Sequence, residues 1–143
     1  MAYYVDTSAL VKLVSAELET PALRSWLAQG RELVSSDLAR AELARAVRRA
    51  APERMAQARA VLDSLTLVSL PGATFEAAGR LPPDIWRTLD ALHLAAALEL
   101  GDDLDGIVTY DSRLAAAARA QGIAVLAPGA PADLGTGSPG SMT

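Results

Sequence analysis

The sequence predicts an α/β fold, a three-layer α/β/α sandwich with a mostly parallel central sheet. Short apolar runs alternate along the chain with Ala- and Leu-rich runs of helical spacing. Strands that are separated by helices are joined by right-handed crossovers, so neighbouring strands run parallel and helices cover both faces of the sheet. Aromatic residues make up only 4% of the chain, so the core must be packed from Ala, Leu and Val, whose small side chains let helices approach a sheet closely.

The expected strands are short apolar segments bounded by capping or turn residues. In chain order they are residues 2–5, 33–35, 67–69, 107–110 and 123–126. The first is rich in Tyr and Val, which favour a strand over a helix.

The expected helices combine apolar residues at helical spacing with start and stop signals. In chain order they are residues 8–16, 20–29, 37–49, 52–65, 74–80, 89–100 and 111–121. Ser36 and Thr88 are expected N-caps, and Pro21 stands at a first helical position. Gly101 and Gly122 follow helices as stop signals.

Residues 1–128 are predicted to form one domain, and the Gly-, Pro- and Ser-rich residues 129–143 a disordered tail. The chain has no cysteine, which excludes disulfides, thiolate metal sites and cysteine nucleophiles. No apolar run approaches the ~18–20 residues that a membrane span requires. We therefore expect a cytoplasmic protein without a membrane partner.

The net charge of −4 argues at first against a nucleic-acid partner. Four of the acidic residues are candidate metal ligands, however, and without them the chain has 13 acidic and 13 basic residues. Every basic residue except Lys12 is an arginine, whose forked guanidinium suits phosphate. The charge balance permits an RNA partner without requiring one.

Asp6 and Asp111 each follow directly on a predicted strand. In parallel α/β sheets the carboxyl ends of the strands form the edge where ligands bind, so both carboxylates are expected on that edge. The alternative is that each aspartate only caps the helix that follows it.

Asp90 lies in the first turn of a predicted helix, L-D-A-L-H-L-A-A-A-L, that is apolar almost all round and is therefore expected to be buried. The helix dipole stabilises a carboxylate there by only ~0.3–1 kcal/mol, whereas desolvating an unpaired charge costs several times more. Asp90 thus needs a metal or a structural partner such as Arg87.

Glu42 lies at the edge of the apolar stripe of its helix and has Arg45 and Arg49 as neighbours. The alternative to a functional role is a surface salt bridge. Taken together, Asp6, Glu42, Asp90 and Asp111 supply only hard oxygen ligands, which favour Mg²⁺ or Mn²⁺ over zinc.

Such ions suit phosphodiester hydrolysis. Basic residues that could hold an RNA backbone are Lys12, Arg45, Arg49, Arg87 and Arg113. His93, the only histidine, is interpreted as a core residue with its hydrogen bonds satisfied. Trp26 and Trp86 are interpreted as packing anchors, with base stacking as an alternative for Trp86.

Three motifs in this order resemble the PIN-domain toxins of VapBC toxin–antitoxin pairs. They are V-D-T-S-A-L-V-K-L, R-T-L-D-A-L-H-L-A-A-A-L, and I-V-T-Y-D-S-R-L followed by A-x-x-x-G-I-x-V. Glu42, in S-S-D-L-A-R-A-E-L, falls where such toxins carry a helix glutamate. The resemblance covers residues 2–128.

That resemblance implies a PIN-like fold and a Mg²⁺- or Mn²⁺-dependent endoribonuclease, the toxin of a toxin–antitoxin pair. The acidic residues of the family's metal site carry over onto Asp6, Glu42, Asp90 and Asp111, and an accessory hydroxyl onto Thr109. It also implies a homodimer and a small VapB-like antitoxin whose C-terminal segment fills the active-site groove. Operator DNA would be bound only indirectly, through the antitoxin.

Two other functions remain open at this stage. A non-catalytic PIN-fold module could bind RNA or protein, although a complete set of four acids argues against it. A phosphatase or phosphotransferase with an aspartyl nucleophile wants D-x-D-x-[TV] after the first strand, whereas the run here is D-T-S-A-L, with no second acid.

Overall fold

The computed structural model of the chain describes residues 1–82, 84 and 86–131. Within these residues a five-stranded sheet forms the centre, and all of its strand pairs are parallel. In spatial order the strands are β3 (Thr66–Val68), β2 (Leu33–Ser36), β1 (Ala2–Val5), β4 (Leu104–Val108) and β5 (Val125–Leu126). Of the tail predicted at 129–143, residues 132–143 lie outside the described part of the chain.

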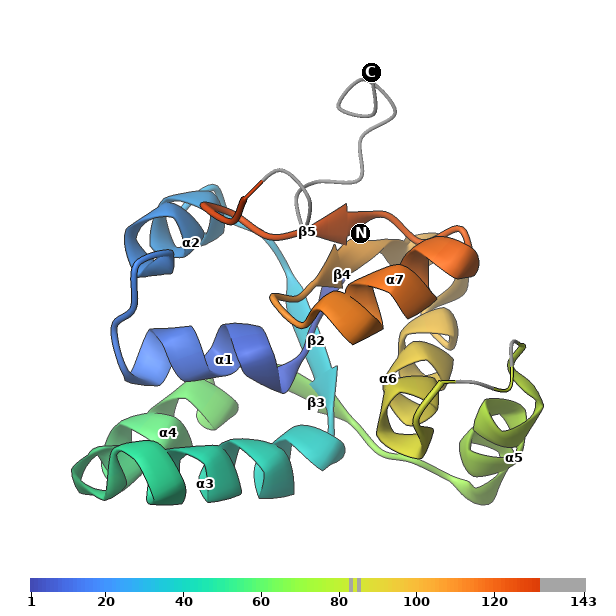
Figure 1. Cartoon of the computed structure of the whole chain (residues 1–143), viewed down its shortest axis with the longest axis horizontal. Coiled ribbons are helices and arrows are strands. Elements are labelled where there is room, and N and C mark those ends of the chain that lie inside the picture. The colour runs from blue at the N-terminus through green and yellow to red at the C-terminus, as the bar shows by residue number, and fades with distance from the viewer. Residues whose placement is uncertain (83, 85, 132–143) are drawn as a thin grey trace.

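Helices cover both faces of this sheet, as Figure 1 shows. One layer contains α1 (Thr7–Val14), α2 (Thr20–Leu27), α3 (Leu38–Ala50) and α4 (Met55–Asp63). The other contains α5 (Gly72–Arg80), α6 (Thr88–Leu98) and α7 (Ser112–Ala120). The predicted three-layer α/β/α sandwich is confirmed. None of the helices among the described residues is both long and apolar enough to span a bilayer.

The core has two halves, one on each face of the sheet. Adjacent residues of a strand point to opposite faces, and accordingly Tyr4 packs with residues of α6 and α7 while Val5 packs with residues of α1 and α3. Ala, Leu and Val dominate both halves, as the low aromatic content predicted. Burial of these apolar side chains is the main favourable contribution to folding.

The strand order places a topological switch point between β1 and β4. From β1 the chain proceeds outward to β2 and β3, and it then returns to the other side of β1 for β4 and β5. The helices that follow β1 and β4 lie on opposite faces of the sheet (Figure 1). In α/β sheets ligands bind at the carboxyl ends of the strands at such a point, and a pocket lies there. The residues that follow directly are Asp6 and Thr109 to Asp111.

Several predicted strand boundaries differ from the observed ones, and the starts of β4 and β5 differ for clear physical reasons. β4 begins at Leu104 rather than at residue 107 because its pairing with β1 overrides the poor strand propensities of Asp105 and Gly106. A Cβ atom at Gly106 would lie 2.7 Å from Cδ1 of Leu126 and 3.0 Å from the carbonyl oxygen of Ala124, so the segment of β5 approaches closely where this residue has no side chain. β5 begins only at Val125, since the amide of Ile123 still bonds to the Ala118 carbonyl at the end of α7.

Two predicted N-caps are also displaced. Ser36 is the last residue of β2, and Asp37 is the N-cap of α3, although the Ser36 hydroxyl still accepts a 3.3 Å hydrogen bond from the Leu38 amide. Thr88 is the first residue of α6, and Arg87 stands at the cap without a side-chain hydrogen bond to the helix.

Candidate active site

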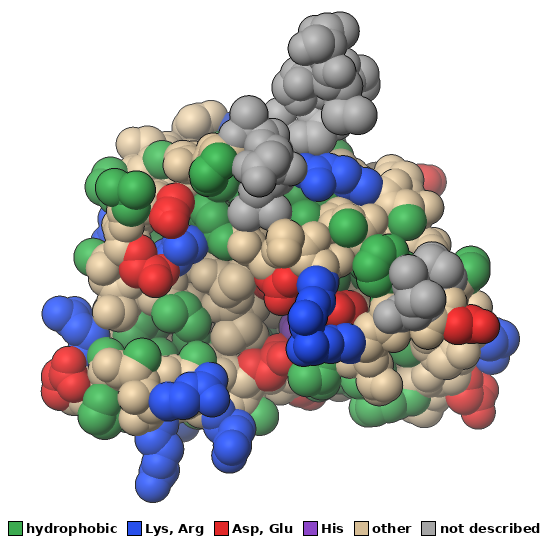
Figure 2. All heavy atoms as spheres, viewed as in Figure 1, with side chains coloured by type: hydrophobic (Ala, Val, Ile, Leu, Met, Phe, Trp, Pro, Cys, Tyr) green, Lys and Arg blue, Asp and Glu red, His purple; other side chains and the backbone are tan. Residues whose placement is uncertain are grey.

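The four acidic residues singled out from the sequence line one pocket. Asp6, Glu42, Asp90 and Asp111 come from the ends of β1 and β4 and from α3 and α6, and the pocket between them has a volume of about 170 Å³. Figure 2 shows acidic side chains gathered around the single histidine in the middle of one face, with basic side chains over them. The structure therefore brings together residues that are up to 105 positions apart in sequence.

Asp6 is the N-cap of α1 and is only 5% exposed. Its Oδ1 accepts hydrogen bonds from the Ser8 hydroxyl at 2.7 Å and the Ala9 amide at 3.4 Å, and its Oδ2 accepts one from the Thr109 hydroxyl at 2.8 Å. Burial raises the pKa of Asp6 to about 6, although these hydrogen bonds and the nearby His93 act to lower it. Capping and a place in the pocket, weighed as alternatives from the sequence, occur together.

Asp111 repeats this arrangement at the start of α7. Its Oδ1 accepts hydrogen bonds from the amides of Arg113 at 2.8 Å and Leu114 at 3.4 Å. Its own amide donates to the Thr109 hydroxyl oxygen at 3.1 Å. Thr109, which the family resemblance suggested as an accessory residue, is fully buried and links the backbone of Asp111 to the carboxylate of Asp6.

Asp90 has no hydrogen bond or ion pair from its side chain among the described residues, although the residue is only 9% exposed. Burial raises the pKa of Asp90, and the charge of Asp111 raises it further. His93, Arg87 and Arg113 oppose this rise through their positive charge. Arg87, the structural partner considered from the sequence, thus acts at a distance and does not form a salt bridge.

Glu42 and His93 form a pair that the sequence did not reveal. The Nε2 of His93 lies 2.7 Å from Oε1 of Glu42, and the Thr7 hydroxyl donates to the same oxygen at 3.0 Å. Burial alone would raise the pKa of Glu42, but the hydrogen bond and charge of His93 lower it overall. Burial alone would lower the pKa of His93, but Glu42 and the other pocket carboxylates raise it.

His93 is buried and hydrogen-bonded as predicted, but it lines the pocket and is not confined to the core. The available signal was its position three residues after Asp90, which places both side chains on one face of α6. Thr7 and Ser8 also line the pocket, and they were not singled out from the sequence.

The candidate RNA-binding arginines lie in two places, at the pocket and on α3. Arg87 lines the pocket, and Arg113 is exposed in the first turn of α7. Arg45 and Arg49 are exposed on α3, where they line a shallow hollow with Arg48. None of the four candidate arginines, nor Arg48, forms a salt bridge within the described residues.

Lys12, the remaining candidate, makes its contacts within the protein. Its ammonium group lies 3.0 Å from Glu17 and 3.1 Å from Glu19, and 4.6 Å from the ring centroid of Tyr110. The lysine side chain is only 10% exposed, so contact with an RNA phosphate would require both ion pairs to break. These contacts indicate that Lys12 stabilises the segment between α1 and α2, and its expected contact with RNA stays a prediction.

The donor set of the pocket fits a divalent cation. It consists mainly of carboxylate oxygens, and the Asp90 side chain has no hydrogen-bond or ion-pair partner in the part of the chain that the structure describes. A positive ion would relieve the repulsion between Asp90 and Asp111. Among the residues that the structure describes, no three acidic or histidine side chains are close enough to form a ready cluster of metal ligands. The pocket is thus an open arrangement of candidate ligands and not a closed cage.

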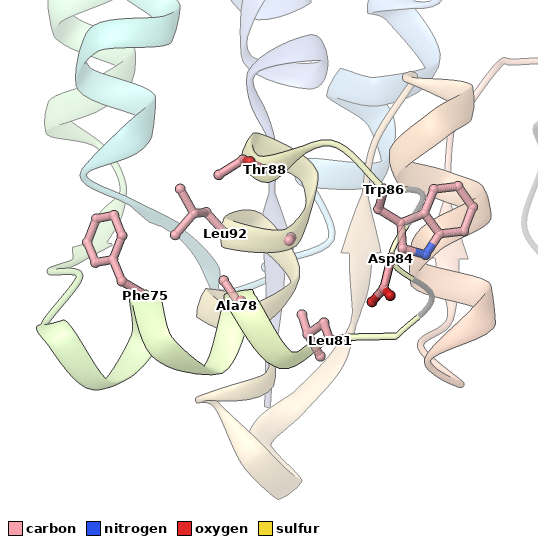
Figure 3. Close-up of a pocket in the computed structure, with 9 residues that line it drawn as sticks. Phe75, Ala78, Leu81, Asp84, Trp86, Thr88 and Leu92 are labelled. Atoms are coloured by element: carbon pink, nitrogen blue, oxygen red, sulfur yellow. The ribbon is translucent and has the colours of Figure 1, made fainter.

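A second hollow, of about 380 Å³, lies between α5 and α6 and is drawn in Figure 3. Phe75 and Trp86 stand at its opposite ends, and Asp84 is the one carboxylate among the described residues that line it. Trp86 also packs against the core beside α6 and α7, consistent with its interpretation as an anchor. This lining offers no cluster of acids for phosphate chemistry.

Comparison with known proteins agrees with this geometry. Residues 3–120 match the model of the PIN domain family. The chain is 44% identical over 127 residues to the ribonuclease VapC46 of Mycobacterium tuberculosis, covering 89% of the chain and 98% of that protein. It is 42% identical over 132 residues to the ribonuclease VapC47 of the same species, covering 89% and 97%.

Solved structures share the fold at low sequence identity. The M. tuberculosis toxin VapC20, described as cleaving the sarcin–ricin loop, aligns with a TM-score of 0.68 at 17% identity, covering 81% of this chain and 95% of that one. A chain of a toxin–antitoxin complex from Klebsiella pneumoniae aligns with a TM-score of 0.68 at 18% identity, covering 89% and 98%. By its fold, its motif order and its identity to these relatives, the chain belongs to the PIN-domain family and, within it, to the VapC ribonucleases.

Proposed function

We propose that this protein is a metal-dependent endoribonuclease that hydrolyses RNA phosphodiester bonds and serves as the toxin of a toxin–antitoxin pair. The observation that carries the proposal is the convergence of four carboxylates in one pocket at the switch point of a parallel sheet. One of them, Asp90, makes no side-chain hydrogen bond or ion pair among the described residues and lines the pocket, which leaves both of its oxygens available to a cation.

In this proposal Asp6, Asp90 and Asp111 hold Mg²⁺ or Mn²⁺, and Glu42 completes the site directly or through a water molecule. The ion would supply a more acidic water as nucleophile and would stabilise the leaving 3′ oxygen. The protein's own residues prepare the site: Thr109 and Ser8 fix both oxygens of Asp6, and two amides of α7 fix Oδ1 of Asp111. Fixed ligands reduce the reorganisation that binding requires.

The exposed arginines offer a path for the RNA backbone to the pocket. Arg87 and Arg113 flank Asp90 closely enough to affect its pKa, so they can contact the phosphates next to the scissile bond. Arg45 and Arg49 follow Glu42 on α3 by about one and two turns and extend this positive surface away from the pocket. Positive residues beside an acidic centre let an acidic protein bind a polyanion locally.

The same pocket suits inhibition by a partner. A concentration of carboxylates without a matching number of bound cations attracts an arginine side chain, and a small VapB-like antitoxin could supply one from its C-terminal segment. We place the activity in the cytoplasm, where the RNA substrate is found, and we expect the protein to act as a homodimer that reaches operator DNA only through the antitoxin.

A cleavage assay with tRNA and ribosomal RNA tests the proposal. The parent protein should cut RNA with Mg²⁺ or Mn²⁺ and should stop when EDTA is added. Asp90→Asn should abolish cleavage with little change in the fold, because the Asp90 side chain makes no hydrogen bond to any described residue that the substitution would remove. Cleavage in EDTA, or an Asp90→Asn variant as fast as the parent, would show that the site works differently; binding of RNA without any cleavage would favour the non-catalytic module.

A further inference from the structure

A chain of hydrogen bonds runs from the centre of the sheet to the pocket. The hydroxyl of Tyr4 on β1 lies 3.0 Å from Oγ of Ser36 at the end of β2 and 2.8 Å from Nδ1 of His93 on α6. The Nε2 of His93 then lies 2.7 Å from Oε1 of Glu42 on α3. Ser36, Tyr4 and His93 are all buried. Residues from two strands and two helices therefore form one polar connection through an otherwise apolar core.

The partners fix where the imidazole carries its proton. A carboxylate oxygen can only accept, so Nε2 of His93 must be the donor to Glu42. In a neutral ring Nδ1 then accepts, and the Tyr4 hydroxyl is the donor within reach. If Nδ1 also carries a proton, it donates to the Tyr4 oxygen, and Tyr4 donates to Ser36. In both cases the Nε2 proton points at Glu42.

Both hydrogen bonds to Glu42 use the same carboxylate oxygen. His93 and the Thr7 hydroxyl meet at Oε1, whereas no hydrogen bond to Oε2 is found among the described residues. One oxygen is thereby held by the protein while the other is free for the pocket that Glu42 lines. The Glu42 side chain is 25% exposed, so it is the point where the buried chain of hydrogen bonds reaches solvent.

A purely structural explanation of this chain is weak. Burying three polar side chains is unfavourable unless all their hydrogen bonds are satisfied, and apolar residues of similar size would fill the same space without that requirement. Partners that orient a ligand residue commonly affect activity by 10- to 100-fold without touching the substrate. Glu42 lines the pocket, so it is the residue that these hydrogen bonds can orient.

We propose that Tyr4 and His93 are positioning residues for RNA cleavage: Tyr4 orients the imidazole of His93, and its Nε2–H holds Glu42 so that Oε2 is presented to the pocket. This inference rests on the proposed function, because it concerns the same pocket. It assigns His93 a role in the site, which the burial of this side chain did not by itself indicate.

Three variants of the full-length protein test the proposal. His93→Leu removes the donor to Glu42, His93→Gln keeps an N–H donor at a similar distance from the backbone, and Tyr4→Phe removes only the hydroxyl. In His93→Leu we expect kcat for RNA cleavage to fall about 10- to 100-fold while KM stays close to that of the parent. His93→Gln should recover most of the loss, and Tyr4→Phe should lower kcat less.

A double variant separates positioning from packing. Tyr4→Phe should reduce kcat in the parent but not in His93→Leu, because Tyr4 acts only through the imidazole. Thermal unfolding of each variant measures whether its folded fraction at the assay temperature equals that of the parent. A folded His93→Leu variant with the kcat of the parent, or an undiminished effect of Tyr4→Phe in the His93→Leu background, would overturn the proposal.

A spectroscopic measurement on the metal-free protein is independent of cleavage. His93 is the only histidine, so the ring signals of histidine in NMR spectra belong to it without ambiguity. We expect a slowly exchanging Nε2 proton whose signal shifts in Glu42→Gln, and its absence would refute the hydrogen-bond chain whatever the activity. A parent protein that shows this signal but does not cleave RNA with Mg²⁺ or Mn²⁺ would instead overturn the proposed function. The hydrogen bonds from Tyr4 through His93 to Glu42 would then have no role in catalysis.

Discussion

The hydroxyl of Thr109 donates a 2.8 Å hydrogen bond to Oδ2 of Asp6, and this bond joins the segments that follow two adjacent strands, β4 and β1. The same hydroxyl oxygen accepts a hydrogen bond from the Asp111 amide at 3.1 Å. One threonine side chain thus sets the relative position of two candidate metal ligands. Its burial keeps water from replacing either contact.

Thr109→Val should therefore weaken both stability and cleavage. Valine has nearly the same shape but leaves an oxygen of Asp6 and the Asp111 amide without this partner, so the free energy of unfolding should fall by about 1–3 kcal/mol. The pKa of Asp6 should rise further, since the Thr109 hydrogen bond acts to lower it. Urea unfolding and RNA cleavage measure the two effects, and Thr109→Ser is the control that keeps the hydroxyl. A valine variant equal to the parent in both measurements would contradict this role.

Asp6 gives the metal-free protein an unusual dependence of stability on pH. Its pKa is about 6 when folded and has the ordinary value of 3.8 when unfolded, so the folded state binds more protons between these values. The contribution of Asp6 is favourable to folding at low pH and is lost as the pH rises through about 6. At pH 7.5 the buried charge should reduce the free energy of unfolding by on the order of 1–3 kcal/mol.

Asp6→Asn isolates this contribution. In EDTA the variant should be more stable than the parent at pH 7.5 by a margin that shrinks toward pH 4.5. The difference between the two proteins is the relevant quantity, because Glu42, whose pKa is lowered, contributes with the opposite sign. Urea unfolding at several pH values measures it, and a margin that does not change with pH would show that Asp6 does not titrate in this range.

Lys12→Met should affect the fold and leave RNA binding unchanged. The substitution leaves Glu17 and Glu19 without their shared cation, and we expect the free energy of unfolding to fall by about 1–2 kcal/mol, less than for a fully buried pair because both glutamates are partly exposed. RNA affinity measured on the folded protein should match that of the parent. A clear loss of affinity would restore Lys12 to the RNA-binding surface.

The fold and the acidic residues of the site follow from rules that act locally in sequence. Strand–helix alternation predicts a parallel sheet, and a parallel sheet brings the carboxyl ends of its strands together, so Asp6 and Asp111 could be placed on one edge. Asp90 was recognisable because an apolar helix makes a lone carboxylate expensive. These arguments need only the local pattern around each residue and the order of strands and helices along the chain.

The interactions of the site depend on contacts that no local rule contains. His93 and Glu42 are 51 positions apart, and the sequence does not say which residues of α3 face α6. Lys12 looked available for RNA because the loop that brings Glu17 and Glu19 back to it has no periodic pattern. The start of β4 was missed because its pairing with β1 compensates for Asp105 and Gly106, residues that disfavour strands.

The arginines of α3 provide a test of how RNA approaches the pocket. Arg45 and Arg49 are exposed, form no salt bridge within the described residues, and lie on the helix that carries Glu42. Since their proposed contacts are to phosphates, Arg45→Gln with Arg49→Gln should weaken RNA binding for all sequences alike and leave kcat at saturating RNA unchanged.

Salt dependence distinguishes this role from a general effect of charge. Each lost contact to single-stranded RNA should reduce the slope of log affinity against log salt concentration by about 0.7, so the double variant should differ from the parent by about 1.4. Arg24→Gln with Arg80→Gln, on α2 and α5, changes the net charge equally and serves as the matched control. A contribution from net charge alone would appear in both double variants. Equal slopes for the two would therefore place the RNA elsewhere. A reduced slope in the α3 variant alone would place the RNA backbone along that helix.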